Sequence, residues 1–139
     1  MNPDQFFFHD LTHFPIVTAR HDGAQPGYST GWIREMEWLV ENPHRFVMVV
    51  PDMRREAAHE DRKAMIAWQT ANLPRLRARC RAFIGVERDP AARDTLRKRA
   101  EKMSRAFGLP FLTVATPGEA LQCARELLGQ AGPGGFNVD

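Results

Sequence analysis

The chain has 139 residues, of which 43% are hydrophobic, and a formal net charge of +2. A chain of this length can bury the core of one domain without disulfides or a structural metal. Cys80 and Cys123 lack metal-ligand spacing and indicate core residues in a reducing compartment. No basic segment precedes a long apolar one at the N-terminus, and no apolar run approaches the roughly 18 residues of a membrane span. We therefore expect a cytoplasmic protein that does not use a membrane.

Two short aromatic and β-branched runs come first, Phe6 to His9 and Phe14 to Ala19. Residues 10–13 between them are typical of a turn, so the two runs are predicted to form an antiparallel pair of strands at a sheet edge. The His9-Asp10-x-x-His13 spacing resembles a metal pair on a helix, but strand and turn geometry would keep the two rings apart. We therefore expect no metal site there.

A loop over residues 23–31 leads to the first helix, and Ser29 or Thr30 is predicted to cap it. The apolar stripe of this helix runs from Trp32 to Val40, whereas Trp38 falls on its polar side. Because aromatic side chains anchor many protein interfaces, Trp38 is a candidate partner-binding residue. The alternative is that the sheet or the phenylalanine-rich N-terminus covers it.

The run at residues 45–50 is apolar after its first residue, as in a strand buried on both faces, and is predicted to be the central strand. A polar segment follows, and then a long helix whose predicted buried side includes Met65, Ile66 and Leu76. Pro74 must kink or restart this helix, because proline has no N–H to donate and crowds the preceding turn.

The second half of the chain has the order β-α-β-α, with predicted strands at residues 82–86 and 111–115. Each strand leads to a helix that has its own capping signals. Asp89-Pro90 begins the first helix and Gly108 ends it, and a Thr116-x-x-Glu119 capping box begins the second.

This alternation predicts one α/β domain over residues 1–130, followed by a flexible glycine-rich tail at residues 131–139. The sheet is predicted to be mixed and mostly parallel, with four to five strands, one antiparallel edge strand and about four amphipathic helices. Ligands usually bind at the edge where parallel strands end. The residues that follow the predicted strands, and so would meet at this edge, include His21, Asp22, Asp52, Met53, Arg54, Arg88 and Thr116.

Three stretches carry a family resemblance: the extended segment from Pro15 to Gly23, the stretch from Trp68 through Asn72 to Ala82, and the helix start at Glu119 to Leu121. With the element order over residues 6–128, they resemble the bacterial SpoIIAA-like proteins. The STAS-type fold of that family is shared in outline with the CRAL-TRIO lipid-transfer domains. The resemblance implies a four- or five-stranded mixed sheet with one antiparallel edge strand, and it does not imply an enzyme.

The chain departs from the anti-sigma-factor antagonist branch of this family. Those proteins carry a phosphorylatable Ser or Thr after an Asp, at the start of the helix that follows the central strand. Residues 51–58 contain Asp52 but no hydroxyl side chain, so a phosphorylation switch is not expected there. A lipid-tail pocket is not expected either, because so short a chain has little apolar surface left after closing its own core.

Charge is unevenly distributed: residues 75–105 hold 11 Lys and Arg against 4 Asp and Glu. Such a bias can mark a nucleic-acid surface. The charges of the helix near residues 93–105 nevertheless lie outside its core positions, where solvation alone explains them. A single-strand groove would also need exposed aromatic rings, whereas Phe83 and Phe107 occupy predicted core positions.

The sequence has no serine, cysteine or glycine-rich motif of a known catalytic class. The leading hypothesis is therefore a non-enzymatic regulatory module without cofactor or metal, which binds a protein partner or a second copy of itself. Its candidate partner-binding residues are Trp38, Asp52, Met53, Arg54 and His59.

Two other hypotheses remain. The first is a small enzyme or ligand-binding protein with its site at the strand ends, where the candidate catalytic residues are His21, Asp22, Asp52 and Arg88. The second is nucleic-acid binding through the arginine-rich helices.

Overall fold

The computed structural model describes residues 5–20, 25–51 and 58–129, which form a mixed α/β fold. The strands are β1 (His9–His13), β2 (Ile16–Ala19), β3 (Phe46–Val50), β4 (Cys80–Val86) and β5 (Phe111–Val114). The helices are α1 (Ser29–Glu41), α2 (His59–Ala71), α3 (Leu73–Arg79), α4 (Pro90–Phe107) and α5 (Pro117–Gly129). None of these helices is long and apolar enough to cross a membrane.

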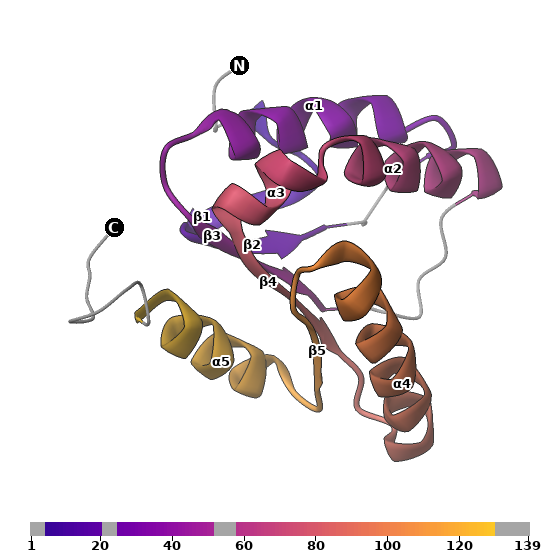
Figure 1. The fold of residues 1–139 in the computed structure, drawn as a ribbon, viewed down its shortest axis with the longest axis vertical. Coiled ribbons are helices and arrows are strands. Elements are labelled where there is room, and N and C mark those ends of the chain that lie inside the picture. Colours follow the sequence, from indigo (N-terminus) through magenta and orange to yellow (C-terminus); the bar gives the residue numbers. More distant parts are fainter. Residues whose placement is uncertain (1–4, 21–24, 52–57, 130–139) are drawn as a thin grey trace.

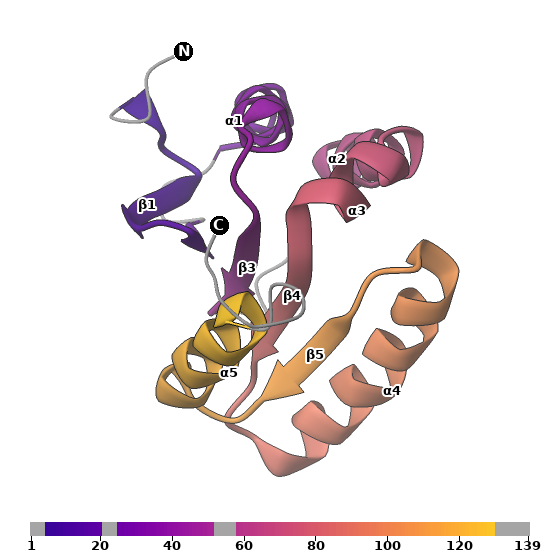
Figure 2. The same cartoon turned by 60° about the vertical axis from the view of Figure 1, so that its left-hand side comes forward.

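The strands lie in the sheet in the order in which they occur in the chain, from β1 to β5. β1 and β2 are antiparallel, whereas β2, β3, β4 and β5 are parallel, which confirms the predicted mixed sheet with an antiparallel pair at one edge. The four parallel strands therefore end on one edge of the sheet. Helices α1, α2 and α3 lie over one face and α5 lies over the other (Figures 1 and 2).

The central strand β3 is buried on both faces, as its continuous apolar run predicted. Phe46 and Met48 pack in one core, with Trp32, Met36, Leu39 and Val40 of α1 and Leu76 of α3. Val47 and Val49 pack in a second core, with Ala120 and Ala124 of α5. The two cores follow from the strand repeat, because alternate side chains of a strand point to opposite faces of the sheet.

The first strand begins later than the sequence predicted. Residues 10–13 belong to β1, and Phe6 to Phe8 precede it, so the predicted turn at residues 10–13 is wrong. The chain reverses instead at Phe14-Pro15, a cis peptide, where the Phe14 N–H donates to the Leu11 carbonyl. The Asp10 carboxylate accepts the Thr12 N–H, a local bond of the kind found in turns, at the point where the pairing of β1 with β2 is irregular. This bond explains why the composition of residues 10–13 resembles that of a turn.

The capping signals of the second half are confirmed. The Asp89 carboxylate accepts the Ala92 N–H, and Gly108 ends α4 with a φ of 64°, in the left-handed region that favours glycine. The Thr116 hydroxyl accepts the Glu119 N–H, while the Glu119 carboxylate accepts the N–H of Ala115. Pro74 restarts the predicted long helix as α3, so the described residues contain five helices rather than about four.

The predicted buried side of this stretch is correct for Met65 of α2, which packs against the core, and for Leu76 of α3, which is fully buried, but not for all of α2. Ile66 was expected to be buried but is 49% exposed. The buried residues are Asp61 and Trp68, and Met65 packs beside them. The Trp68 indole N–H donates to Glu37 of α1 at 2.8 Å, so a bond between two helices decides which side of α2 faces inward.

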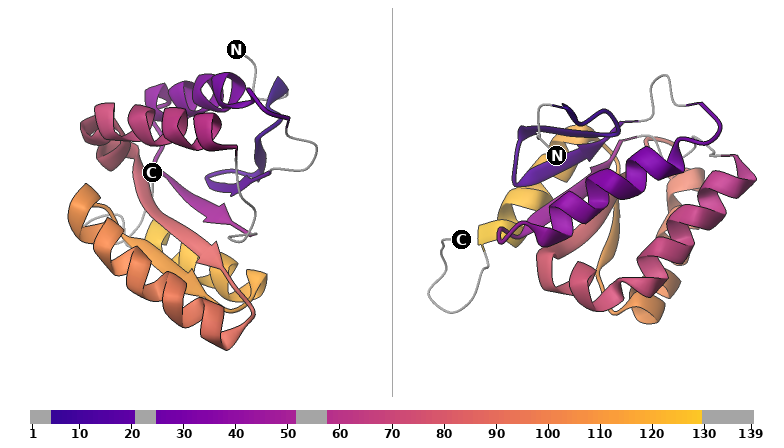
Figure 3. Two further views of the ribbon diagram at one scale, coloured as in Figure 1. Left: turned by 90° about the vertical axis from the view of Figure 1, so that its right-hand side faces the viewer. Right: turned by 90° about the horizontal axis from the view of Figure 1, so that it is seen from above.

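Helix α4 is the longest of the described helices and has no buried residue. It runs beside β5 at the border of the molecule (Figures 2 and 3). Its apolar stripe, with Leu96, Met103 and Phe107, is half-buried. The Ser104 hydroxyl accepts the Phe111 N–H of β5 at 2.8 Å, which occupies a backbone donor at the edge of the sheet.

Candidate functional site

Most of the residues predicted at the strand ends lie outside the described part of the chain. His21 and Asp22 belong to the gap at residues 21–24, and Asp52, Met53 and Arg54 belong to the gap at residues 52–57. The structure therefore does not place these five residues. The predicted tail at residues 131–139 also lies outside the described residues.

Besides Trp38, three predicted residues are placed, at different points of the fold. Arg88 is exposed just after β4, and its carbonyl accepts a hydrogen bond from Arg93 at 3.1 Å. His59 is the exposed first residue of α2, and its Nδ1 lies 3.4 Å from Nη2 of Arg62. Thr116 caps α5. Within the described part of the chain, no hydrogen bond or ion pair joins Arg88, His59 and Thr116 to one another.

Trp38 is half-buried by the chain itself. Its ring meets the edges of the Phe6 and Phe14 rings, with centroid separations of 5.4 and 6.2 Å. The N-terminal phenylalanine-rich segment thus covers part of the side of α1 that the helical pattern assigned to solvent. Trp38 consequently contributes to the packing of the fold, whatever it does toward a partner.

A buried cluster, which the sequence did not reveal, joins α1 to the residues before and at the start of β1. Glu35 is 2% exposed, and its carboxylate accepts the backbone N–H groups of Phe7 at 2.7 Å and of Phe8 at 3.0 Å. It also lies 2.8 Å from His9 Nδ1. Because two backbone donors already point at this carboxylate, it serves as an acceptor and the proton of the third bond sits on Nδ1.

This arrangement fixes the orientation of the His9 ring. The ring is 1% exposed and lies against Phe6 and Trp32, with centroid distances of 6.3 and 5.8 Å. Among the described residues, His9 Nε2 has no hydrogen-bond partner. His9 pairs with Ala19, so it lies at the edge where the parallel strands end. A histidine oriented by a carboxylate offers its other nitrogen as a directed acceptor or base.

Close packing reinforces the cluster. A Cβ built on Gly31 of α1 would lie 2.7 Å from the Phe8 ring, so the absence of a side chain at residue 31 lets Phe8 lie directly on the helix. The sequence signal that could have revealed the cluster is a glutamate beside the apolar stripe of α1. Its partners lie more than 25 residues earlier in the chain, and no local pattern indicates them.

A second buried carboxylate caps α1 from another helix. Asp61 of α2 accepts the Gly27 N–H at 2.9 Å and the Ser29 N–H at 3.0 Å. The bond from Gly27 lowers the pKa of Asp61, with a smaller contribution from Ser29. Neither Ser29 nor Thr30 caps the helix as predicted. Tyr28 holds the cap position, and its side chain makes no capping hydrogen bond to the helix.

Glu37 links three helices from the other side of α1. Its two carboxylate oxygens accept the Trp68 indole N–H at 2.8 Å and an Arg75 N–H at 2.9 Å. Two hydrogen bonds lower the pKa of Glu37; the bond from Arg75 has the larger effect and the bond from Trp68 the smaller. Glu37 therefore fixes α2 and α3 against α1, and its carboxylate has a structural role.

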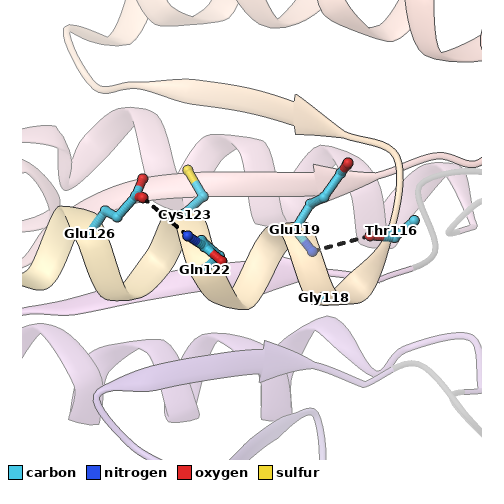
Figure 4. A pocket seen from close by; sticks show the side chains of 6 residues that line it. All are labelled: Thr116, Gly118, Glu119, Gln122, Cys123 and Glu126. Carbon is cyan, nitrogen blue, oxygen red and sulfur yellow. Dashed lines mark hydrogen bonds between the residues drawn. The ribbon is translucent and has the colours of Figure 1, made fainter.

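The surface of α5 carries a shallow hollow of about 400 Å³, lined by Thr116, Gly118, Glu119, Gln122, Cys123 and Glu126 (Figure 4). Burial, with a smaller contribution from Glu126, raises the pKa of the Cys123 thiol, which disfavours the nucleophilic thiolate. The hollow offers carboxylates and an amide but no activated nucleophile.

The described residues contain no group of three or more His, Cys, Asp or Glu side chains that could hold a metal ion. Comparison of the chain with protein-family models, with curated proteins and with solved structures finds no match.

Proposed function

We propose that this protein is a non-enzymatic regulatory module of the STAS/SpoIIAA-like type, which acts by binding a protein partner. Two features support the family assignment. The strands follow the order of the chain in one mixed sheet with an antiparallel edge pair, and amphipathic helices cover both faces. This is the architecture that the sequence resemblance implies.

The exposure of α4 carries the functional part of the proposal. A long helix of a globular protein normally buries one face, and most of its stability comes from that packing. α4 has no buried residue, while its apolar stripe lies half-buried along β5. A partner that covers this helix would complete the burial that the chain itself leaves unfinished.

Two experiments test the proposal: capture of proteins from lysate on the immobilised protein, and light scattering on the untagged protein. We expect a specific protein to be captured from lysate of the native organism, or a concentration-dependent dimer to appear in light scattering after gel filtration. A strictly monomeric protein that captures nothing above an empty-matrix control would contradict the proposal. Trp38→Ala is a poor test variant, because it removes contacts with Phe6 and Phe14 that the fold itself uses.

One observation favours a second candidate function, a ligand-binding or catalytic site. His9 has an orienting carboxylate and a buried Nε2 without a described partner, which is the arrangement of a general base. A thermal-shift screen of metals, nucleotides and acidic metabolites tests it. A compound that stabilises the wild type but not His9→Gln supports this candidate, and the absence of any such compound counts against it.

A further inference from the structure

The exposed side of α4 is strongly cationic. Arg97, Arg99, Lys102 and Arg105 are exposed and make no ion pair with any described residue. Lys98 pairs with Asp94 one turn earlier at 3.3 Å, but both side chains remain mostly exposed, at 74% and 60%. Arg93 is engaged at the start of the helix, where it donates to backbone carbonyls. Positive charge on α4 is therefore largely uncompensated within the described chain.

The helical repeat separates this charge from the contact with the sheet. Ser104 faces β5, because its hydroxyl accepts the Phe111 N–H. At 3.6 residues per turn, Lys98, Arg99 and Lys102 lie on the side of α4 away from Ser104. Met103 lies one turn after the exposed Arg99 on the same face and is half-buried, so apolar surface borders the cationic surface.

The apolar border continues onto the sheet. Phe107 of α4 meets the edge of Phe111 at 5.7 Å, and Phe111 stacks on Phe83 of β4 at 5.1 Å. All three rings are half-buried. These rings pack against the hydrophobic core on the sheet side of α4, so the apolar groups that adjoin the charge are the half-buried Leu96 and Met103. Apolar surface beside uncompensated positive charge is the composition of a protein docking site.

From this combination we infer that α4 docks an acidic amphipathic segment of another protein. Its carboxylates would face Arg99 and Lys102, and its apolar side chains would cover Leu96 and Met103. Charge complementarity selects this partner, because like charges placed opposite each other are repulsive. The inference rests on the proposed function and specifies the surface and the chemistry of the partner.

Two other occupants fit the same surface less well. A second copy in a two-fold contact would place α4 against α4, and so bring two cationic helices together. A nucleic acid would use the charge, but phosphates gain nothing from the apolar residues that border it.

The test measures binding of three fluorescent probes by anisotropy at low salt. The first probe is an acidic amphipathic peptide as long as α4, with leucines at helical spacing and glutamates elsewhere. The second has the same charge but no leucines, and the third is a short DNA duplex. The protein variants are wild type, Arg99→Glu with Lys102→Glu, and Arg125→Glu, an exposed charge reversal on α5 that serves as the matched control.

We expect the first probe to bind wild type and Arg125→Glu equally, and to bind more tightly than the other two probes. The double reversal turns two attractions into repulsions and should weaken binding about tenfold, and added salt should weaken it further. Circular dichroism confirms that the variants fold.

The inference is overturned if the first probe does not bind, if the double reversal binds it as the wild type does, or if the duplex binds as tightly. A dimer that the double reversal abolishes would also overturn it, because the surface would then serve self-association. A lysate protein that the double reversal still captures would refute this surface while leaving the proposed function intact.

Discussion

Glu35→Ala tests whether the buried cluster holds the N-terminal segment onto α1. The substitution removes one acceptor from three donors: the N–H groups of Phe7 and Phe8, and Nδ1 of His9. A hydrogen bond to a charged group contributes about 1.5–3 kcal/mol. The two backbone donors are only partly buried and can regain water if residues 5–8 detach from the helix.

His9 Nδ1 cannot regain a hydrogen bond to water in this way, because the residue is 1% exposed. We therefore expect Glu35→Ala to lose the full contribution of the His9 bond and a fraction of the contribution of the other two. The variant also no longer bears the cost of burying a carboxylate, so the net loss in the free energy of unfolding is about 3 kcal/mol. For a chain of this size, that corresponds to a decrease in Tm of roughly 10 °C.

Urea unfolding followed by tryptophan fluorescence measures the free energy, and amide exchange reports protection at residues 7 and 8. Glu41→Ala is the matched control, since Glu41 lies on the same helix with a side chain that is 69% exposed. A free-energy difference from wild type below about 0.5 kcal/mol, with unchanged protection of the Phe7 and Phe8 amides, would refute the reasoning.

Three further predictions concern single positions. Gly108→Ala places a Cβ at a φ of 64° and 3.2 Å from the Arg77 guanidinium, so we expect a loss of about 1–2 kcal/mol in urea unfolding; an unchanged midpoint would contradict it. The Asp61 pKa is lowered from its ordinary value of 3.8, chiefly by the bond from Gly27, so its contribution to stability is present above that value and is lost as the pH falls below about 4. Asp61→Asn should therefore show a shallower acid-induced loss of Tm than wild type, and identical slopes would count against the cap. Burial raises the pKa of Cys80 to about 12, so with a thiol reagent at neutral pH we expect Cys80 to react only upon unfolding and Cys123 slowly; rapid labelling of Cys80 in the folded protein would be inconsistent with its burial.

The parts of the fold that the sequence predicts well are those specified locally. The apolar run of β3, the Asp89 and Thr116 caps, Gly108 and Pro74 each act within a few residues of the chain. Propensity and capping chemistry are enough for such features, because the groups that satisfy one another are neighbours in the sequence.

The errors arise where distant residues override a local signal. Ser29 would have been an adequate cap, but Asp61 supplies the acceptor from 32 residues away. Ile66 fits the apolar stripe predicted for α2, yet Trp68, which bonds to Glu37 of α1, is buried and Ile66 is exposed. Sequence periodicity describes one helix at a time and does not contain the contacts between helices.

The candidate site was only partly accessible to prediction for the same reason. His9 was considered with His13, its neighbour in sequence, whereas its structural partner is Glu35 on α1. The cationic character of α4 could be read from composition, but the absence of any buried residue on that helix could not. The proposed docking surface rests on that absence together with the charge bias.

The most direct test of the central claim compares three immobilised proteins in the same native lysate: wild type, Arg99→Glu with Lys102→Glu, and Arg125→Glu. Quantitative mass spectrometry of the captured proteins is the measurement. The proposed role of α4 predicts a captured protein with an acidic amphipathic segment that is retained by wild type and Arg125→Glu and lost with the double reversal. The same captured proteins in equal amounts on all three would contradict it.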